Sequence, residues 1–244
     1  MNTRWVVTSI TKKHYEGGQS VILNVELCNK HMREIRDFTL TSEIIEESIK
    51  KYPYTGEKRI KDPVAENALL PPIILPFYSY IFEFGKVPSP DELVNLYLKQ
   101  EHFSEDSNRN ITVSYRSSKI IVKKEGLTAR ILRTYPSILR DVHFYCMAVE
   151  SNFFQIVWYS FAMDYENGID IRVKYCDKWY NIALLQDTVR SRAFKTKKPY
   201  RHLDMNNKLI YINLKQTLSK RCGDYNLYTF HHVEQLKQEL NEKL

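Results

Sequence analysis

The sequence predicts an α/β (α+β) protein with a mixed central sheet. Three observations lead to this class. Residues 153–187 resemble three strands joined by tight turns, residues 127–151 before them have the periodicity of a helix, and residues 208–216 after them resemble a further strand. With a helix-like basic segment before that last strand, the order from 128 to 216 is helix, three strands, helix, strand.

Residues 1–104 are expected to form a smaller N-terminal α+β region that contacts substrate or a partner. Its first element is a predicted hairpin, because apolar runs at 5–10 and 20–28 flank a Gly-Gly pair. A short helix is then expected to begin at Thr41 or Ser42 and to end at a proline, residue 53.

The Pro- and Tyr-rich stretch 53–88 is expected to be irregular. Ser89 and Glu92, placed around a proline, predict the capped start of a helix that follows. The polar segment 104–110 has no apolar anchor and is the predicted boundary to a second domain, residues 111–244.

The second domain begins with a predicted hairpin over 111–126. The helix of residues 127–151 is expected to kink or restart at Pro136. A terminal helix with Thr229 as a possible cap closes the chain.

Composition favours an anionic partner, with DNA or RNA first. The chain has 244 residues, a formal net charge of +7 and a pI near 9.0. Its four cysteines show no paired spacing, which argues against a zinc ribbon and against a disulfide scaffold. Without an evident signal peptide or an unbroken apolar span, we expect a soluble, cytoplasmic protein with no membrane partner.

A candidate metal site follows from polar residues at the ends of the predicted strands. Asp170 opens the middle strand just after an Asn-Gly turn, Gln186 lies near the end of the third, and Glu150 ends the preceding helix. Carboxylates that meet at one edge of a sheet suit Mg²⁺, or Mn²⁺, which prefers oxygen ligands. Each residue also has a structural interpretation, as a turn residue, a strand end or a solvated helix end.

This pattern resembles the PD-(D/E)XK nuclease superfamily, in which an Asp begins one strand and (Glu/Gln)-x-Lys lies on the next. The version with Gln also occurs in the nuclease subunit of heteromeric transposases. The resemblance covers residues 128 to 216 and implies that Asp170 and Glu150 hold the metal ion and that Gln186 completes the site. Position 188 is Thr where the family has Lys, and Lys195 or Lys197 would replace it.

Other carboxylates near the predicted strands are rivals for the same role. They are Asp164, Glu166 and Asp187.

A basic segment follows the third predicted strand and contains no acidic residue. It is expected to neutralise phosphates, although a solvated basic helix is the commoner fate of such a run. The residues expected to bind nucleic acid are Arg190, Arg192, Lys198 and Arg201. A second basic patch, comprising Lys119, Lys123, Lys124, Arg130 and Arg133, is expected to extend the track.

The sequence therefore predicts a Mg²⁺-dependent DNA endonuclease of a mobile-element or defence system, acting in transposition or a related process. The alternative is a non-catalytic nucleic-acid-binding subunit of a larger nucleoprotein assembly, which the threonine at 188 favours. A third possibility is a protein-interaction component, for which the Tyr-rich region 53–88 would supply the docking surface.

Overall fold

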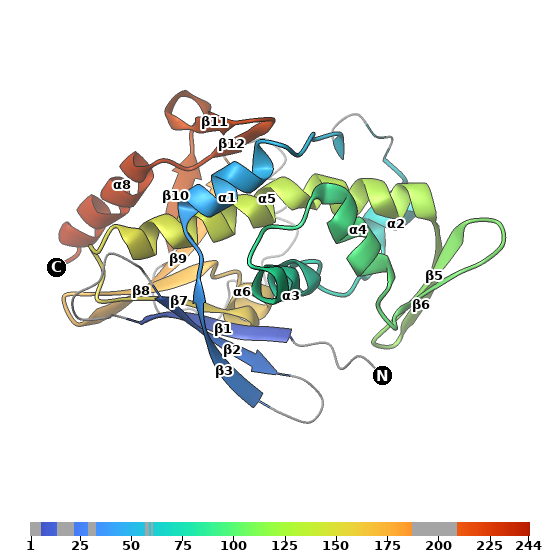
Figure 1. Ribbon diagram of the computed structural model, residues 1–244, viewed down its shortest axis with the longest axis horizontal. Coiled ribbons are helices and arrows are strands. Elements are labelled where there is room, and N and C mark those ends of the chain that lie inside the picture. Colours follow the sequence, from blue (N-terminus) through green and yellow to red (C-terminus); the bar gives the residue numbers. More distant parts are fainter. Residues whose placement is uncertain (1–5, 14–21, 29–32, 57–58, 60, 187–208) are drawn as a thin grey trace.

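The computed structural model describes residues 6–13, 22–28, 33–56, 59, 61–186 and 209–244. These residues form a mixed α+β fold in which helices lie on one side of a large sheet, as Figure 1 shows for α1, α3 and α5. The predicted fold class is confirmed.

The large sheet has seven strands in the order β10-β9-β8-β7-β1-β2-β3. β10 runs parallel to β9, while every other neighbouring pair is antiparallel. A parallel pair needs a crossover connection, and here that connection includes residues 187–208, outside the described residues. The strands are β1 (Val6–Lys13), β2 (Ile22–Cys28), β3 (Arg33–Thr39), β7 (Ile156–Ser160), β8 (Ile171–Tyr175), β9 (Lys178–Gln186) and β10 (Ile210–Leu214).

The predicted order of the C-terminal core is largely present. α5 (Lys124–Glu150) is followed by β7, β8, β9 and, after the undescribed segment, β10. One element was not predicted: the seven-residue helix α6 (Phe161–Asn167) lies between β7 and β8, where a tight turn was expected. The second helix of the predicted order falls on residues 187–208 and so lies outside the described residues.

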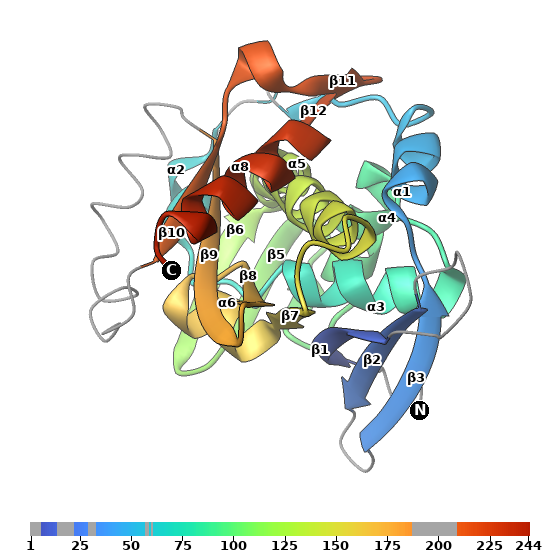
Figure 2. The ribbon, with the colours of Figure 1, turned by 90° about the vertical axis from the view of Figure 1, so that its left-hand side faces the viewer.

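α5 is the central helix of the fold and is buried over most of its length. It continues through Pro136 rather than restarting there. Figure 2, which looks along α5, shows α8 (Phe230–Asn241) and α3 (Ile74–Phe84) on either side of it. The side chains between these helices and the sheet form the hydrophobic core.

The N-terminal strands belong to the same sheet as the C-terminal core. β1 pairs with β7, with Ile10 opposite Tyr159, and this joins residues on either side of the predicted boundary. The boundary segment itself, 104–110, forms the turn between β4 (Phe103–Glu105) and β5 (Asn110–Tyr115) instead of a linker. Asp106 stabilises this turn, because its side chain accepts hydrogen bonds from the backbone N–H groups of residues 108 and 110 at 2.9 and 2.8 Å.

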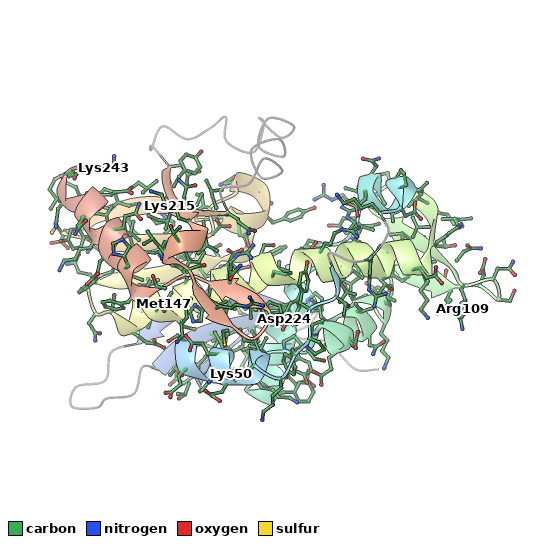
Figure 3. The ribbon with its side chains drawn as sticks, turned by 90° about the horizontal axis from the view of Figure 1, so that it is seen from above. Lys50, Arg109, Met147, Lys215, Asp224 and Lys243 are labelled. Carbon is green, nitrogen blue, oxygen red and sulfur yellow. The ribbon has the colours of Figure 1, made fainter. Side chains whose placement is uncertain are left out.

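A three-stranded sheet is built from β4, β5 and β6 (Ser118–Lys123). The hairpin predicted over 111–126 is thus confirmed. Figure 3 shows Arg109, in the turn between β4 and β5, at the opposite end of the molecule from Lys243.

The stretch 53–88 is helical in part, so the prediction of irregular structure is wrong there. It contains α2 (Pro63–Asn67) and α3, which is buried on most of its surface. Pro76 does not break α3 because it occupies the first turn, where its missing N–H has no intrahelical partner to lose. Gly85, in the left-handed conformation, ends the helix.

The remaining helices begin at the residues that the sequence predicted. Thr41 caps α1 (Ser42–Ile49), and Ser89 and Glu92 form the reciprocal cap of α4 (Pro90–Leu98). Thr229 caps α8 together with the imidazole at position 232. The small hairpin of β11 (Lys220–Cys222) and β12 (Tyr225–Leu227) precedes α8, and a 3-10 turn (Gln216–Leu218) follows β10.

Candidate active site

Asp170 is held at the point where the chain enters β8. Gly168, in the left-handed conformation, ends α6 and turns the chain toward the sheet. The Asp170 N–H donates to the Ile182 carbonyl at 3.0 Å, and the Asp170 carboxylate accepts from the Leu184 N–H at 2.6 Å. The sequence-predicted residue is therefore fixed against β9 by both its backbone and its side chain.

Gln186 is the last residue of β9, on the same side of the strand as Leu184. In the parallel ladder it lies opposite Leu214 of β10. Between these two β9 residues, the carbonyl of Leu185 accepts a hydrogen bond of 3.0 Å from the hydroxyl of Tyr228. The end of β9 thus lies close to both Asp170 and the buried Tyr228 ring.

Glu150 has a structural partner of its own. Its two carboxylate oxygens accept hydrogen bonds from the backbone N–H and the hydroxyl of Ser42, both at 2.6 Å. A carboxylate at the first residue of α1 satisfies one of the N–H groups that a helix leaves unpaired, and it interacts favourably with the helix dipole.

The register of α5 along the sheet separates Glu150 from Asp170. The Tyr145 hydroxyl donates to the carbonyl of Val157, so this part of α5 lies over the first half of β7. Asp170 precedes Ile171 at the other end of β7 and β8, since Trp158 pairs with Arg172. The part of α5 level with Asp170 is therefore expected one to two turns before Tyr145, and not at Glu150.

Asp141, which was not predicted as a site residue, lies about one turn before Tyr145 on α5. Burial raises the pKa of its carboxyl to about 8; Arg140 opposes this shift, and the negative charge of Asp164 adds to it. Arg140 is itself buried, and burial lowers the pKa of its guanidinium. A signal was present in the sequence: Asp141 falls three residues after Ile138 and four before Tyr145, on the apolar stripe of the helix.

Three buried tyrosines connect Asp141, Asp164 and Asp170. Burial raises the pKa of Tyr228, with further contributions from Asp141 and Asp170. Burial likewise raises the pKa of Tyr159, whose hydroxyl hydrogen-bonds Asp164 at 3.4 Å.

Tyr78 completes the group, with its ring centroid 4.7 Å from that of Tyr159. Burial raises its pKa, and the charges of Asp164 and Asp141 add to the shift. Aspartates from α5, α6 and the start of β8 thus gather around one buried aromatic group. Of the rival carboxylates, Asp164 belongs to this group.

Asp141, Asp170 and Gln186 are the candidate oxygen ligands for a metal ion. Within the residues that the structure describes, no group of three or more His, Cys, Asp or Glu side chains could hold a metal ion. The charges of Asp141 and Asp170 both contribute to the raised pKa of Tyr228, and Gln186 ends the strand whose Leu184 N–H holds Asp170. Mg²⁺ keeps several of its waters and needs few protein ligands, so such a set suits it.

The residues of the predicted basic track divide into two groups. Arg190, Arg192, Lys195, Lys197, Lys198 and Arg201, together with Thr188 and Asp187, lie outside the described residues. In the second basic patch, three of the five side chains have structural partners. Arg130 donates to the carbonyls at 65 and 68 at the end of α2, Arg133 pairs with Glu66, and Lys124 pairs with Glu105 at 2.7 Å.

Comparison with models of known families, with curated proteins and with solved structures found no match. Among the described residues, no helix is long and apolar enough to cross a membrane.

Proposed function

We propose that the protein is a metal-dependent DNA endonuclease of a mobile-element or defence system that hydrolyses phosphodiester bonds. The observation that carries the proposal is the arrangement at the end of the β8–β9 hairpin. There the Asp170 carboxylate is hydrogen-bonded to the Leu184 N–H, two residues before Gln186, and the charges of Asp141 of α5 and of Asp170 both raise the pKa of Tyr228.

Asp141 and Asp170 would hold the metal ion, which on binding supplies a water of lowered pKa and offsets negative charge on the phosphate. The hydrogen bond from the Leu184 N–H already fixes the position of the Asp170 carboxylate before a metal ion binds. Asp141 must lose its proton to serve as a ligand, because burial has raised the pKa of its carboxyl. Gln186 would orient the site through its amide, and Lys195 or Lys197 would stabilise charge on the phosphate.

In the reaction, the oxygen of a water molecule forms a bond to phosphorus while the bond from phosphorus to one sugar oxygen breaks. The water loses one proton, and the departing sugar oxygen gains one. Positioning and electrostatic stabilisation supply most of the catalysis in such transfers, which suits a site built from fixed carboxylates.

The proposal is tested with supercoiled plasmid and Mg²⁺ or Mn²⁺, with and without EDTA. The native protein should cut, and Asp170→Asn and Asp141→Asn should each lower the rate by at least about 100-fold. Asp177→Asn is the matched control, because Asp177 lies in the exposed turn at the other end of the β8–β9 hairpin. Cutting that survives both substitutions, or that ignores EDTA, would contradict the proposal.

A second candidate function is a non-catalytic nucleic-acid-binding subunit. The threonine at 188, where the family has Lys, favours it. In that case neither the native protein nor Asp170→Asn would cut the plasmid, while both would shift it on a gel in a salt-sensitive way.

A further inference from the structure

The face of the sheet opposite α5 carries two tryptophans and an arginine in contact. Ile171 and Val173 of β8 are buried toward α5, so Arg172 between them points to the other face. Trp158 of β7 pairs with Arg172, and Trp179 of β9 pairs with the residue two positions further along β8. We call Trp158, Arg172 and Trp179 the Trp-Arg cluster.

The cluster is held together by stacking of the guanidinium on both indoles. The central carbon of the Arg172 guanidinium lies 5.5 Å from the ring centroid of Trp158 and 4.9 Å from that of Trp179. The two indole rings are 6.2 Å apart and nearly edge to face. Such cation–π contacts orient the guanidinium and leave its charge in place.

Arg172 lacks an acidic partner among the described residues. Its Nε atom is buried without a hydrogen-bond partner in that part of the chain, and burial lowers the pKa of the guanidinium. Nearby Lys174, in contrast, pairs with Asp177 at 2.8 Å. A partly buried cation that no carboxylate of the described segments neutralises is suited to an anion from outside the protein.

Part of the cluster is open to a ligand. The Trp179 side chain remains 39% exposed, although it is large and apolar. Tyr211 of β10 points to the same face, since it lies opposite Ala183, and it is 38% exposed. Exposed rings next to a cation match a chain of bases and phosphates better than they match an apolar partner surface.

The position of the cluster relates it to the candidate active site. Asp170 immediately precedes β8, and Arg172 is two residues further along the chain, about 7 Å at the rise of an extended strand. A nucleic-acid strand carries one phosphate per nucleotide, so a strand with one phosphate at Asp170 could present a nearby phosphate to Arg172.

We propose that the Trp-Arg cluster binds a single-stranded segment of DNA, with an unpaired base stacked on Trp179 and a phosphate paired with Arg172. An unpaired base is required because a base within a duplex already has both its faces stacked on its neighbours. The inference deepens the proposed function: it assigns a DNA substrate with an unpaired or opened segment next to the bond that is cut.

The test measures binding of a fluorescent oligo(dT) 20-mer, and of a duplex of equal length, in EDTA at low salt. Trp179→Leu should weaken binding of the single strand by about 5- to 100-fold, the range expected for one stacked base, with little effect on the duplex. Arg172→Gln should weaken it in the same direction, and Arg172→Lys, which keeps the charge but loses the planar stack, should fall between.

Two controls match these substitutions in chemistry. Phe84→Leu removes an exposed aromatic ring at the end of α3, and Arg221→Gln removes one positive charge on β11. Both should bind the 20-mer as the native protein does. Circular dichroism and thermal melting show whether each variant is folded, and the exposed position of Trp179 makes its variant the safer of the two.

The inference would be overturned if folded Trp179→Leu and Arg172→Gln bind the single strand as the native protein does. It would also be overturned if these variants lose binding of single strand and duplex equally, or if native protein does not bind the 20-mer. The plasmid assay separates this inference from the proposed function. If native protein cuts the plasmid and the cluster variants bind the single strand normally, only the nuclease proposal is supported. If the cluster variants specifically lose single-strand binding and native protein does not cut, only the inference about the cluster is supported.

Discussion

The carboxylate of Asp170 accepts a 2.6 Å hydrogen bond from the backbone N–H of Leu184 on the neighbouring strand. This bond gives Asp170 a structural task besides the metal ligation that we propose for it. The two tasks respond differently to substitution. Asp170→Asn keeps an oxygen that can accept from Leu184, whereas Asp170→Ala leaves that N–H without its partner.

We therefore expect the urea concentration at the unfolding midpoint of Asp170→Asn to be nearly that of the native protein. Asp170→Ala should lose about 1–3 kcal/mol of stability, the cost of an unsatisfied buried donor. Urea denaturation followed by circular dichroism measures both. Equal stability of the two variants would show that the bond to Leu184 contributes little.

Asp141 should make stability depend on pH in a way that Mg²⁺ reverses. Its pKa is raised in the folded protein, so its contribution favours folding below the ordinary aspartate pKa and is lost as pH rises toward about 8. A bound cation favours the ionised carboxyl, so Mg²⁺ should stabilise the protein more at pH 9 than at pH 6.

Thermal melting at the two pH values, with and without Mg²⁺, measures this effect. Asp141→Asn should melt with a weaker pH dependence and should lose the Mg²⁺ effect. A Mg²⁺ effect that is unchanged in this variant would exclude Asp141 as a ligand.

Glu150 is expected to matter for stability rather than for cutting. Glu150→Ala removes both hydrogen bonds to Ser42 and should cost about 1–3 kcal/mol, while Ser42→Ala removes one of them and should cost less. Urea denaturation gives the cost, and the plasmid assay gives the cutting rate per folded molecule. A stable Glu150→Ala protein that does not cut would support the original assignment of Glu150 to the metal.

Glu46 is expected to stabilise the fold in a pH-dependent manner. A hydrogen bond with His143 is the largest cause that lowers its pKa to about 2, and Lys220 contributes in the same direction at 2.5 Å. A lowered carboxyl pKa stabilises the folded protein above the ordinary glutamate pKa, and this contribution is lost as pH falls from about 4.5 to about 2.

Glu46→Gln should therefore lose about 2 kcal/mol at pH 7 and progressively less at lower pH. Glu47→Gln is the matched control, because Glu47 makes an exposed ion pair with Lys50 on the same helix. That control should change stability by less than about 1 kcal/mol. A loss for Glu46→Gln that stays constant down to pH 2 would contradict this account.

Much of the fold could be predicted because its signals are local. The strands β7, β8 and β9 show apolar patterns bounded by turn residues, and the starts of α1, α4 and α8 carry capping residues. The pairing of β1 with β7 could not be predicted in this way, because it joins residues about 150 positions apart and depends on tertiary packing. A domain boundary was therefore expected where there is a hairpin turn.

The candidate site was predicted in part, for a related reason. Asp170 immediately precedes β8 and Gln186 ends the neighbouring strand β9, and their spacing along the chain placed them near one end of the sheet. Which carboxylate of α5 lies near Asp170 depends on the position of the helix along the sheet. The hydrogen bond from Tyr145 to the Val157 carbonyl fixes this position, and the sequence alone does not reveal it. Glu150 was chosen as the helical carboxylate because it ends the helix, and Asp141 was not considered.

The most direct measurement is Mn²⁺ binding, followed by electron paramagnetic resonance, with the native protein and with Asp170→Asn, Asp141→Asn and Asp177→Asn. Native protein and Asp177→Asn should remove free Mn²⁺ from solution at the same concentrations, and Asp170→Asn and Asp141→Asn should bind it at least about 10-fold more weakly. Equal binding by all four proteins, or none by the native protein with DNA present, would contradict the assignment of a metal site to Asp141 and Asp170.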